Sequence, residues 1–200
     1  DGDGDGDGDG DGDGDGDSNS SEAPQDIQSV IGDSQLALSE QGSYFKTGSS
    51  YSFNNWGFWA RDGSQTLFRV SIRDDSGSNP PYSLHIEGTP SGTNPVDGSA
   101  VWSGRLRAYE TEDDSLGVPV SGQARLEVDF SSVTLDVDFT NLTEGHSDMV
   151  WRDLGMSNGA FQHTSGSDSI DGAFYGNGHE GAGGKFKRNE LRGVFGALRE

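Results

Sequence analysis

The chain has 200 residues, no cysteine and a formal net charge of −21 at pH 7. The lack of cysteine excludes disulfides, thiolate nucleophiles and cysteine-based zinc sites. The acidic balance argues against binding of nucleic acid or anionic membranes, and no run of 18 apolar residues is present to form a membrane-spanning helix.

Residues 1–24 are predicted to be a disordered acidic tether. Residues 1–17 are an uninterrupted Asp-Gly alternation with nine aspartates and no basic residue. Glycine loses the most backbone entropy on ordering, the carboxylates repel one another, and no apolar residue offsets either cost. We therefore expect a solvated spacer. Calcium binding is the alternative, although the run lacks the apolar anchors that close a calcium loop.

Residues 25–50 form a poorly defined lead-in segment. Ile27–Ile31 has the apolar spacing of one helical turn, with Asp26 as its N-cap. Leu36 and Leu38 are candidates for the start of a strand. This pattern is too weak to indicate a domain.

Residues 51–200 have the pattern of β-strands and are assigned to one barrel domain. Aromatic and branched residues alternate with polar ones in short runs, which clusters of Gly, Asn, Asp, Ser or Pro separate. No long stretch has a 3.6-residue period, so crossover helices are absent and the sheet is expected to be antiparallel. The candidate strands are Ser52–Ala60, Thr66–Arg73, Tyr82–Gly88, Ser99–Glu110, Gly122–Phe130, Val133–Asn141, Ser169–Tyr175 with Gly159–His163 as a partner piece, and Gly183–Lys187 with Leu191–Leu198.

The clearest predicted hairpin is Arg125–Phe139. Apolar and polar side chains alternate along both of its arms. A two-residue turn pairs Phe130 with Val133, gathers the apolar side chains on one face and sets Arg125 opposite Asp138 on the other. One dry and one wet face are typical of the wall of a small barrel, and a two-sheet sandwich would give the same alternation.

Several segments together resemble the β-barrel domain of the transferrin-binding protein B family of Gram-negative surface lipoproteins. The family's barrels read G-x-F-Y-G, a six-residue loop containing Glu, G-G-x-F, and a closing G-x-F-G-A. The loop glutamate matches Glu180. The matching segments are Gly172–Gly176, Gly183–Phe186 and Gly193–Arg199, together with Asp97–Gly104 leading into Gly122–Phe130.

This resemblance spans about residues 51–199 and implies an all-β fold, a small antiparallel eight-stranded β-barrel with a filled interior. It also implies a flexible linker behind a lipidated cysteine upstream of Asp1, at the outer membrane surface or in the periplasm. The chain is too short for the family's two lobes, and residues 25–50 cannot form its handle domain. Single-barrel relatives, such as factor H-binding protein and haemophilin-like haem binders, take different ligands. The resemblance therefore implies the fold better than the ligand.

Few residues indicate chemistry. His179, in a Gly-rich loop, is the candidate for a haem ligand, with an ordinary loop histidine as the alternative. No two histidines are spaced at i, i+2 or i, i+4, so no metal site is predicted. Neighbouring aspartates lie in turns or on the predicted wet face, where solvation explains them better than a glycosidase pair. No catalytic residues are assigned.

Partner-binding residues are predicted in loops of the barrel rim, because loop side chains are not needed to fill the core. The preferred segments are Asp74–Pro81, Glu112–Leu116 and Gly145–Arg152. The expected exposed anchors beside these segments are Trp151, Met149 and Tyr82.

The sequence thus predicts a non-enzymatic, monomeric binding protein that contacts a protein or an iron- or haem-bearing ligand through rim loops. No bound cofactor is assigned unless haem is the ligand. A structural or adhesive display module without a small ligand is the alternative, and a hydrolase that uses loop carboxylates is the third reading.

Overall fold

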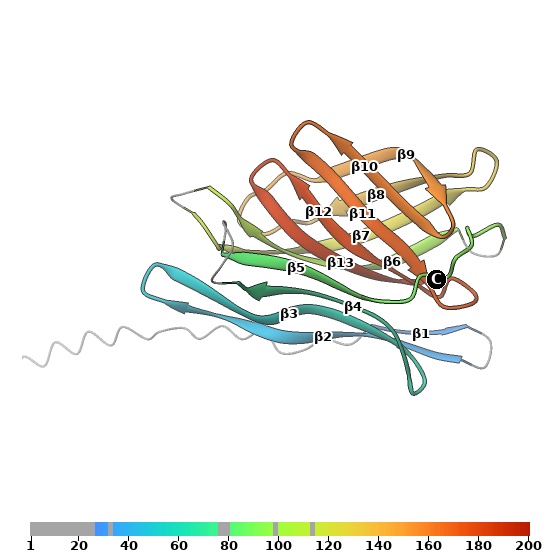
Figure 1. The fold of residues 1–200 in the computed structure, drawn as a ribbon, viewed down its shortest axis with the longest axis horizontal. Coiled ribbons are helices and arrows are strands. Elements are labelled where there is room, and N and C mark those ends of the chain that lie inside the picture. Colours follow the sequence, from blue (N-terminus) through green and yellow to red (C-terminus); the bar gives the residue numbers. More distant parts are fainter. Residues whose placement is uncertain (1–26, 32–33, 76–80, 98–99, 113–114) are drawn as a thin grey trace, which may run out of the picture.

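The computed structural model describes residues 27–31, 34–75, 81–97, 100–112 and 115–200. A closed eight-stranded antiparallel barrel packs against a five-stranded antiparallel sheet (Figure 1). None of the described segments is a helix of the length and apolarity needed to cross a membrane. The sheet consists of β1 (Ile27–Ile31), β2 (Ser34–Thr47), β3 (Ser50–Asp62), β4 (Gln65–Asp74) and β5 (Tyr82–Gly88). The barrel consists of β6 (Val101–Glu110), β7 (Pro119–Asp129), β8 (Thr134–Thr140), β9 (Met149–Ser157), β10 (Ala160–Ser165), β11 (Asp168–Tyr175), β12 (Gly181–Arg188) and β13 (Leu191–Arg199).

The eight-stranded antiparallel barrel predicted from the sequence is confirmed. Each barrel strand pairs with the next along the chain, and the last, β13, closes the barrel against the first, β6. The interior is a packed core, because each of the eight strands contributes inward-pointing apolar side chains to it. Its largest members are the aromatic side chains Trp102, Phe139, Trp151, Phe161, Phe174, Phe186 and Phe195.

The barrel is formed by other strands than the sequence analysis assigned to it. The strands expected at 52–60, 66–73 and 82–88 do form, but they belong to the separate sheet. Ile27–Ile31 is a strand paired with β2, so the helical turn expected there is wrong. An alternating pattern predicts a strand with one buried face, but it does not say which sheet that strand joins.

The sheet packs on the outer wall of the barrel. Leu38, Phe58 and Phe68 from the sheet share one buried cluster with Val194 and Leu198 of β13. A methyl group at Gly183 would lie 2.7 Å from the ring of Phe68. Gly183 and Gly196 of the Gly-aromatic segments therefore make room for the sheet on the barrel's outer wall.

The predicted register of the β7–β8 hairpin is confirmed. Arg125 lies opposite Asp138, as expected, while β7 ends at Asp129 and β8 begins at Thr134. Val133 adopts φ = +56° in the connecting turn, a conformation that β-branched residues rarely take.

Candidate functional site

The loops that follow the even-numbered strands emerge at one end of the molecule, which we call the loop end (Figure 1). In the barrel these are the loops after β6, β8, β10 and β12. In the sheet they are the turn after β2 and the loop after β4. Interactions between neighbouring loops join them into one surface, since the backbone N–H of Thr111 donates to the carbonyl oxygen of Glu190 (2.7 Å).

Tyrosines tie the sheet to the barrel at this end. The rings of Tyr82 and Tyr109 meet edge to face with centroids 4.9 Å apart, and the hydroxyl of Tyr82 donates to the carbonyl oxygen of Tyr51 (2.9 Å). Burial raises the pKa of both Tyr82 and Tyr109 above the ordinary value. The loop end of the sheet is therefore fixed against β6 rather than left to move alone.

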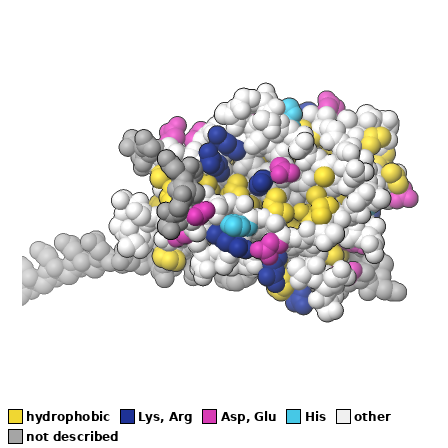
Figure 2. Space-filling model, in the orientation of Figure 1, with side chains coloured by type: hydrophobic (Ala, Val, Ile, Leu, Met, Phe, Trp, Pro, Cys, Tyr) yellow, Lys and Arg dark blue, Asp and Glu magenta, His cyan; other side chains and the backbone are white. Residues whose placement is uncertain are grey.

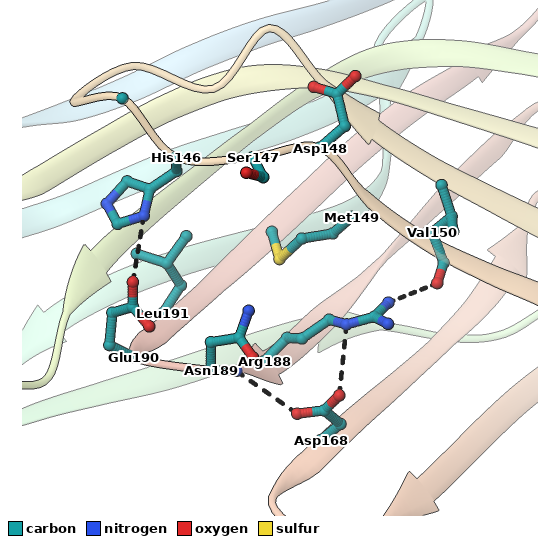
Figure 3. Close-up of a pocket in the computed structure, with 11 residues that line it drawn as sticks. His146, Ser147, Asp148, Met149, Val150, Asp168, Arg188, Asn189, Glu190 and Leu191 are labelled. Carbon is teal, nitrogen blue, oxygen red and sulfur yellow. Dashed lines mark hydrogen bonds and ion pairs between the residues drawn. The ribbon is translucent and has the colours of Figure 1, made fainter.

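A polar cavity of about 410 Å³ lies between the barrel loops of this end (Figure 3). Its walls come from the β8–β9 loop, the start of β11 and the β12–β13 turn. The lining residues are Gly145, His146, Ser147, Asp148, Met149, Val150, Asp168, Arg188, Asn189, Glu190 and Leu191.

His146 bridges two carboxylates on one side of this cavity. Its Nε2 atom lies 2.9 Å from Oε1 of Glu110, and its Nδ1 atom lies 3.4 Å from Oε1 of Glu190. The imidazole is only 13% exposed. Because Glu110 ends β6 and Glu190 lies in the β12–β13 turn, this histidine fastens the β8–β9 loop to two other parts of the wall.

Arg188 fills the opposite side of the cavity. Its Nε atom lies 3.3 Å from the carboxylate of Asp168, and its guanidinium donates to the carbonyl oxygen of Val150 (Figure 3). The same guanidinium stacks over the ring of Trp151, at 4.8 Å from its centroid. It therefore links β12 to β9.

The cavity is suited to recognition. Its charged side chains are already paired with one another or with backbone, so their positions are fixed before a ligand arrives. Within the described part of the chain, no three His, Cys, Asp or Glu side chains are arranged to hold a metal ion. The surface offers polar contacts and a few exposed apolar side chains, of which Phe45 (45% exposed) and Val150 (41%) lie at this end.

The three predicted anchor residues are not exposed. Trp151, Met149 and Tyr82 are 5%, 4% and 8% exposed, so the expectation of exposure is wrong for each. Trp151 and Met149 belong to β9, which points them into the barrel core. Tyr82 begins β5 and is buried between the sheet and the barrel. A loop lies beside each of these residues in the sequence, but each residue belongs to a strand that buries its side chain.

The described residues of the preferred rim segments lie at the loop end. These are Asp74, Asp75, Pro81, Glu112, Ser115, Leu116 and Gly145–Arg152, of which Met149–Arg152 belong to β9; 76–80 and 113–114 lie outside the described residues. No pattern in the sequence indicates Glu110, Glu190 or Arg188 as site residues. Glu110 is far along the chain from Arg188 and Glu190, and closure of the barrel brings all three to the β8–β9 segment that holds His146 and Val150.

His179 lies at the opposite end, between β11 and β12, with φ = +58°. Its Nε2 atom is 3.1 Å from Oγ1 and 2.8 Å from the carbonyl oxygen of Thr93. Its own carbonyl oxygen accepts a hydrogen bond from the indole of Trp102 (2.7 Å). A haem iron could bind Nε2 only after both contacts with Thr93 had broken.

Comparison with known proteins finds likeness in fold alone. No family model matches the sequence, and no curated protein matches it. A crystal structure of a point mutant of Transferrin Binding Protein B from Actinobacillus pleuropneumoniae H49 aligns with 70% of this chain and 79% of its own, with a TM-score of 0.50 and 16% identity. The haemoglobin receptor HpuA from Kingella denitrificans aligns with a TM-score of 0.49 and 15% identity, covering 88% of this chain and 82% of its own.

Transferrin binding protein B from Neisseria meningitidis serogroup B also aligns with a TM-score of 0.49 and 15% identity. That alignment covers 80% of this chain but only 36% of the meningococcal chain. The match to the A. pleuropneumoniae structure, at 16% identity, shows a common fold and no more. The likeness in fold that the Gly-aromatic segments predict is therefore found with one transferrin-binding protein B structure.

Proposed function

We propose that this chain is a non-enzymatic binding protein that presents its loop end to a protein partner. The observation that carries the proposal is the convergence of the described parts of the loops after β2, β4, β6, β8, β10 and β12 on one end of the molecule. The barrel interior is filled by its own aromatic side chains, which leaves the surface as the place for a large ligand.

The partner class that the fold suggests is an iron-carrying protein, because the matched A. pleuropneumoniae protein is named for binding transferrin. The proposal places this chain at the outer membrane surface or in the periplasm, held by a lipid anchor upstream of Asp1. The ion pairs of His146 and Arg188 hold these side chains in place, which suits the cavity to contact with a polar part of a partner.

Binding of the full chain to transferrin, haemoglobin and haem tests this proposal, with biolayer interferometry for the proteins and absorbance for haem. Phe45→Ser and Asp148→Ala change the loop end, and Val96→Ser changes an exposed residue (74%) at the opposite end. We expect a protein probe to bind, the loop-end variants to weaken it at least tenfold, and Val96→Ser to leave it within twofold.

Two results would contradict the proposal. If no probe binds, an iron carrier is not the partner and the display-module alternative gains support. If Val96→Ser weakens binding while both loop-end variants do not, the partner contacts the other end of the molecule.

A further inference from the structure

The outer face of the sheet carries a cluster of two arginines around one tryptophan. The guanidinium carbons of Arg61 and Arg69 lie 4.8 Å and 5.5 Å from the ring centroid of Trp59. Side chains alternate between the two faces of a strand, and the neighbouring Phe58 and Phe68 point toward the barrel. Trp59 is half-buried, whereas the other three tryptophans are at most 5% exposed.

These two arginines lack a carboxylate partner among the described residues. No ion pair joins either to an acidic side chain there, and the buried Nε atom of Arg61 has no hydrogen-bond partner. Glu87 lies opposite Arg69 in the strand register, but it pairs with Arg73 at 2.7 Å. The chain has 34 acidic and only 13 basic residues. Two arginines without a carboxylate partner among the described residues, on an open face, are suited to bind an anionic group that lies outside those residues.

Figure 2 shows Lys or Arg side chains, with Asp or Glu side chains beside them, in the lower part of the view, where Figure 1 draws the sheet. The opposite face of β3 and β4 is covered by the barrel. An anion can therefore reach the cluster only from the outer face. Guanidinium groups pair with carboxylates through two parallel hydrogen bonds, and a tryptophan ring holds them in place by stacking.

The register of the sheet brings the start of its first strand to the same row as this cluster. Ile27 pairs with Leu38, Leu38 pairs with Ala60, and Ala60 is flanked by Trp59 and Arg61. Two strand spacings separate β1 from β3, which is about 10 Å. Residues 18–26 can span up to about 30 Å when extended. The Asp-Gly run that precedes them can therefore reach the cluster.

We propose that the acidic segment Asp1–Asp17 binds the Arg61–Trp59–Arg69 cluster on the outer face of the sheet. The segment supplies nine carboxylates and no basic group. Covalent attachment gives it a local concentration in the millimolar range, which a free anion has to exceed to compete. The segment thus covers this basic site and makes its accessibility depend on ionic strength.

Salt sets the extent of this contact. Screening lengths fall from about 30 Å at 0.01 M to about 8 Å at 0.15 M and about 3 Å at 1 M ionic strength. The segment covers Trp59 at low salt and leaves it at high salt. This inference concerns the sheet and does not depend on what binds the loop end.

Quenching of tryptophan fluorescence by acrylamide tests the proposal in the full chain. Acrylamide is uncharged, so salt does not alter its approach to the arginines. A Trp59→Phe variant identifies the Trp59 signal. We expect the quenching constant of Trp59 to rise at least twofold between about 0.01 M and 0.5 M salt, as screening releases the segment.

Two changed chains and one control complete the test. Replacing the nine aspartates by serine, or making Arg61→Gln with Arg69→Gln, should give a high constant that salt does not change. Arg125→Gln removes an arginine of the barrel wall that already pairs with Glu127, and it should behave as the unchanged chain. Circular dichroism confirms that each variant is folded.

Adding a free Asp-Gly peptide at millimolar concentration to the serine-substituted chain should lower the quenching constant at low salt. The proposal is overturned if the serine-substituted chain keeps the salt response. It is also overturned if the unchanged chain shows none.

Discussion

Arg107 of β6 and Glu40 of β2 form a buried ion pair between the barrel and the sheet. The Nε and Nη2 atoms of Arg107 lie 2.9 Å and 2.6 Å from the two carboxylate oxygens of Glu40. The indole of Trp56 also donates to this carboxylate (3.0 Å). The side chains of Arg107 and Glu40 are 4% and 5% exposed. Each charged group therefore compensates for the hydration that the other loses on burial.

Removing one partner of this pair should destabilise the protein strongly. Glu40→Ala removes both carboxylate oxygens that the buried guanidinium of Arg107 contacts, so we expect the free energy of unfolding to fall by about 3–5 kcal/mol. Urea unfolding followed by circular dichroism measures this. The matched control is Glu87→Ala, which breaks the exposed pair with Arg73 and should cost less than about 1 kcal/mol. Equal losses for the two variants would mean that Glu40 is solvated.

The packing of the Phe68 ring against Gly183 of the barrel gives a second prediction. Gly183→Ala places a methyl group against the buried ring of Phe68, and we expect a loss of about 1–3 kcal/mol in the free energy of unfolding. Gly155→Ala is the control, because nothing lies within 4 Å of the added carbon there. Denaturant unfolding of both variants measures the two losses in free energy. An equal effect of Gly183→Ala and Gly155→Ala would contradict close packing of the sheet against the barrel.

Much of the local structure could be predicted from the sequence, but the division into two sheets could not. The strands at Ser52–Ala60 and Tyr82–Gly88 alternate as barrel strands do, because the sheet also has one face buried against a neighbour. Gly183 and Val194 face outward from the barrel and are covered by the sheet. They indicate a second sheet only when the residues that cover them are known, so the sequence alone does not separate sheet strands from barrel strands.

The missed strand β9 has a local cause. Met149, Trp151 and Leu154 point inward, so the spacing changes from two to three residues at a bulge opposite Asp136. Asp153 has φ = +54° at this bulge. A period-2 search fails at such a site, and the segment therefore looked like a loop with an exposed tryptophan.

The turn between β7 and β8 predicts a stabilising substitution. Val133 has φ = +56° and is 46% exposed, so it bears the steric cost of a left-handed conformation without a packing gain. Val133→Asn should raise the free energy of unfolding by about 1 kcal/mol. Val96→Asn, at an exposed residue outside the positive-φ region, should change it by less than about 0.5 kcal/mol. A fall in stability for Val133→Asn would contradict the turn geometry.

The position of Trp151 in the core predicts a large effect on folding. Its ring meets Phe139 edge to face at 5.3 Å and lies 6.2 Å from that of Phe186. Trp151→Ala should therefore cost about 3–5 kcal/mol in the free energy of unfolding. Val150→Ala, which truncates the exposed neighbour, should cost less than about 1 kcal/mol. If instead Trp151→Ala left stability unchanged and weakened partner binding, the ring would have to lie on the surface.

Alkaline pH should weaken the contact between the sheet and the barrel through Tyr175. Burial and, to a smaller extent, the charge of Asp171 raise the pKa of this tyrosine to about 12, from 10.0. Above pH 10 the unfolded chain gains a tyrosinate that the folded chain resists. The stability that depends on neutral Tyr175 is therefore fully present below pH 10 and is lost as the pH rises toward 12.

A Tyr175→Phe variant measures this contribution, because phenylalanine keeps the ring against Phe68 (centroids 4.8 Å apart) and cannot ionise. Between pH 8 and pH 11.5 we expect the unchanged chain to lose up to about 2 kcal/mol more unfolding free energy than the variant. At pH 8 the two should agree within about 1 kcal/mol. Urea unfolding at both pH values gives the difference, and an equal loss in both chains would show that Tyr175 ionises as readily when folded as when unfolded.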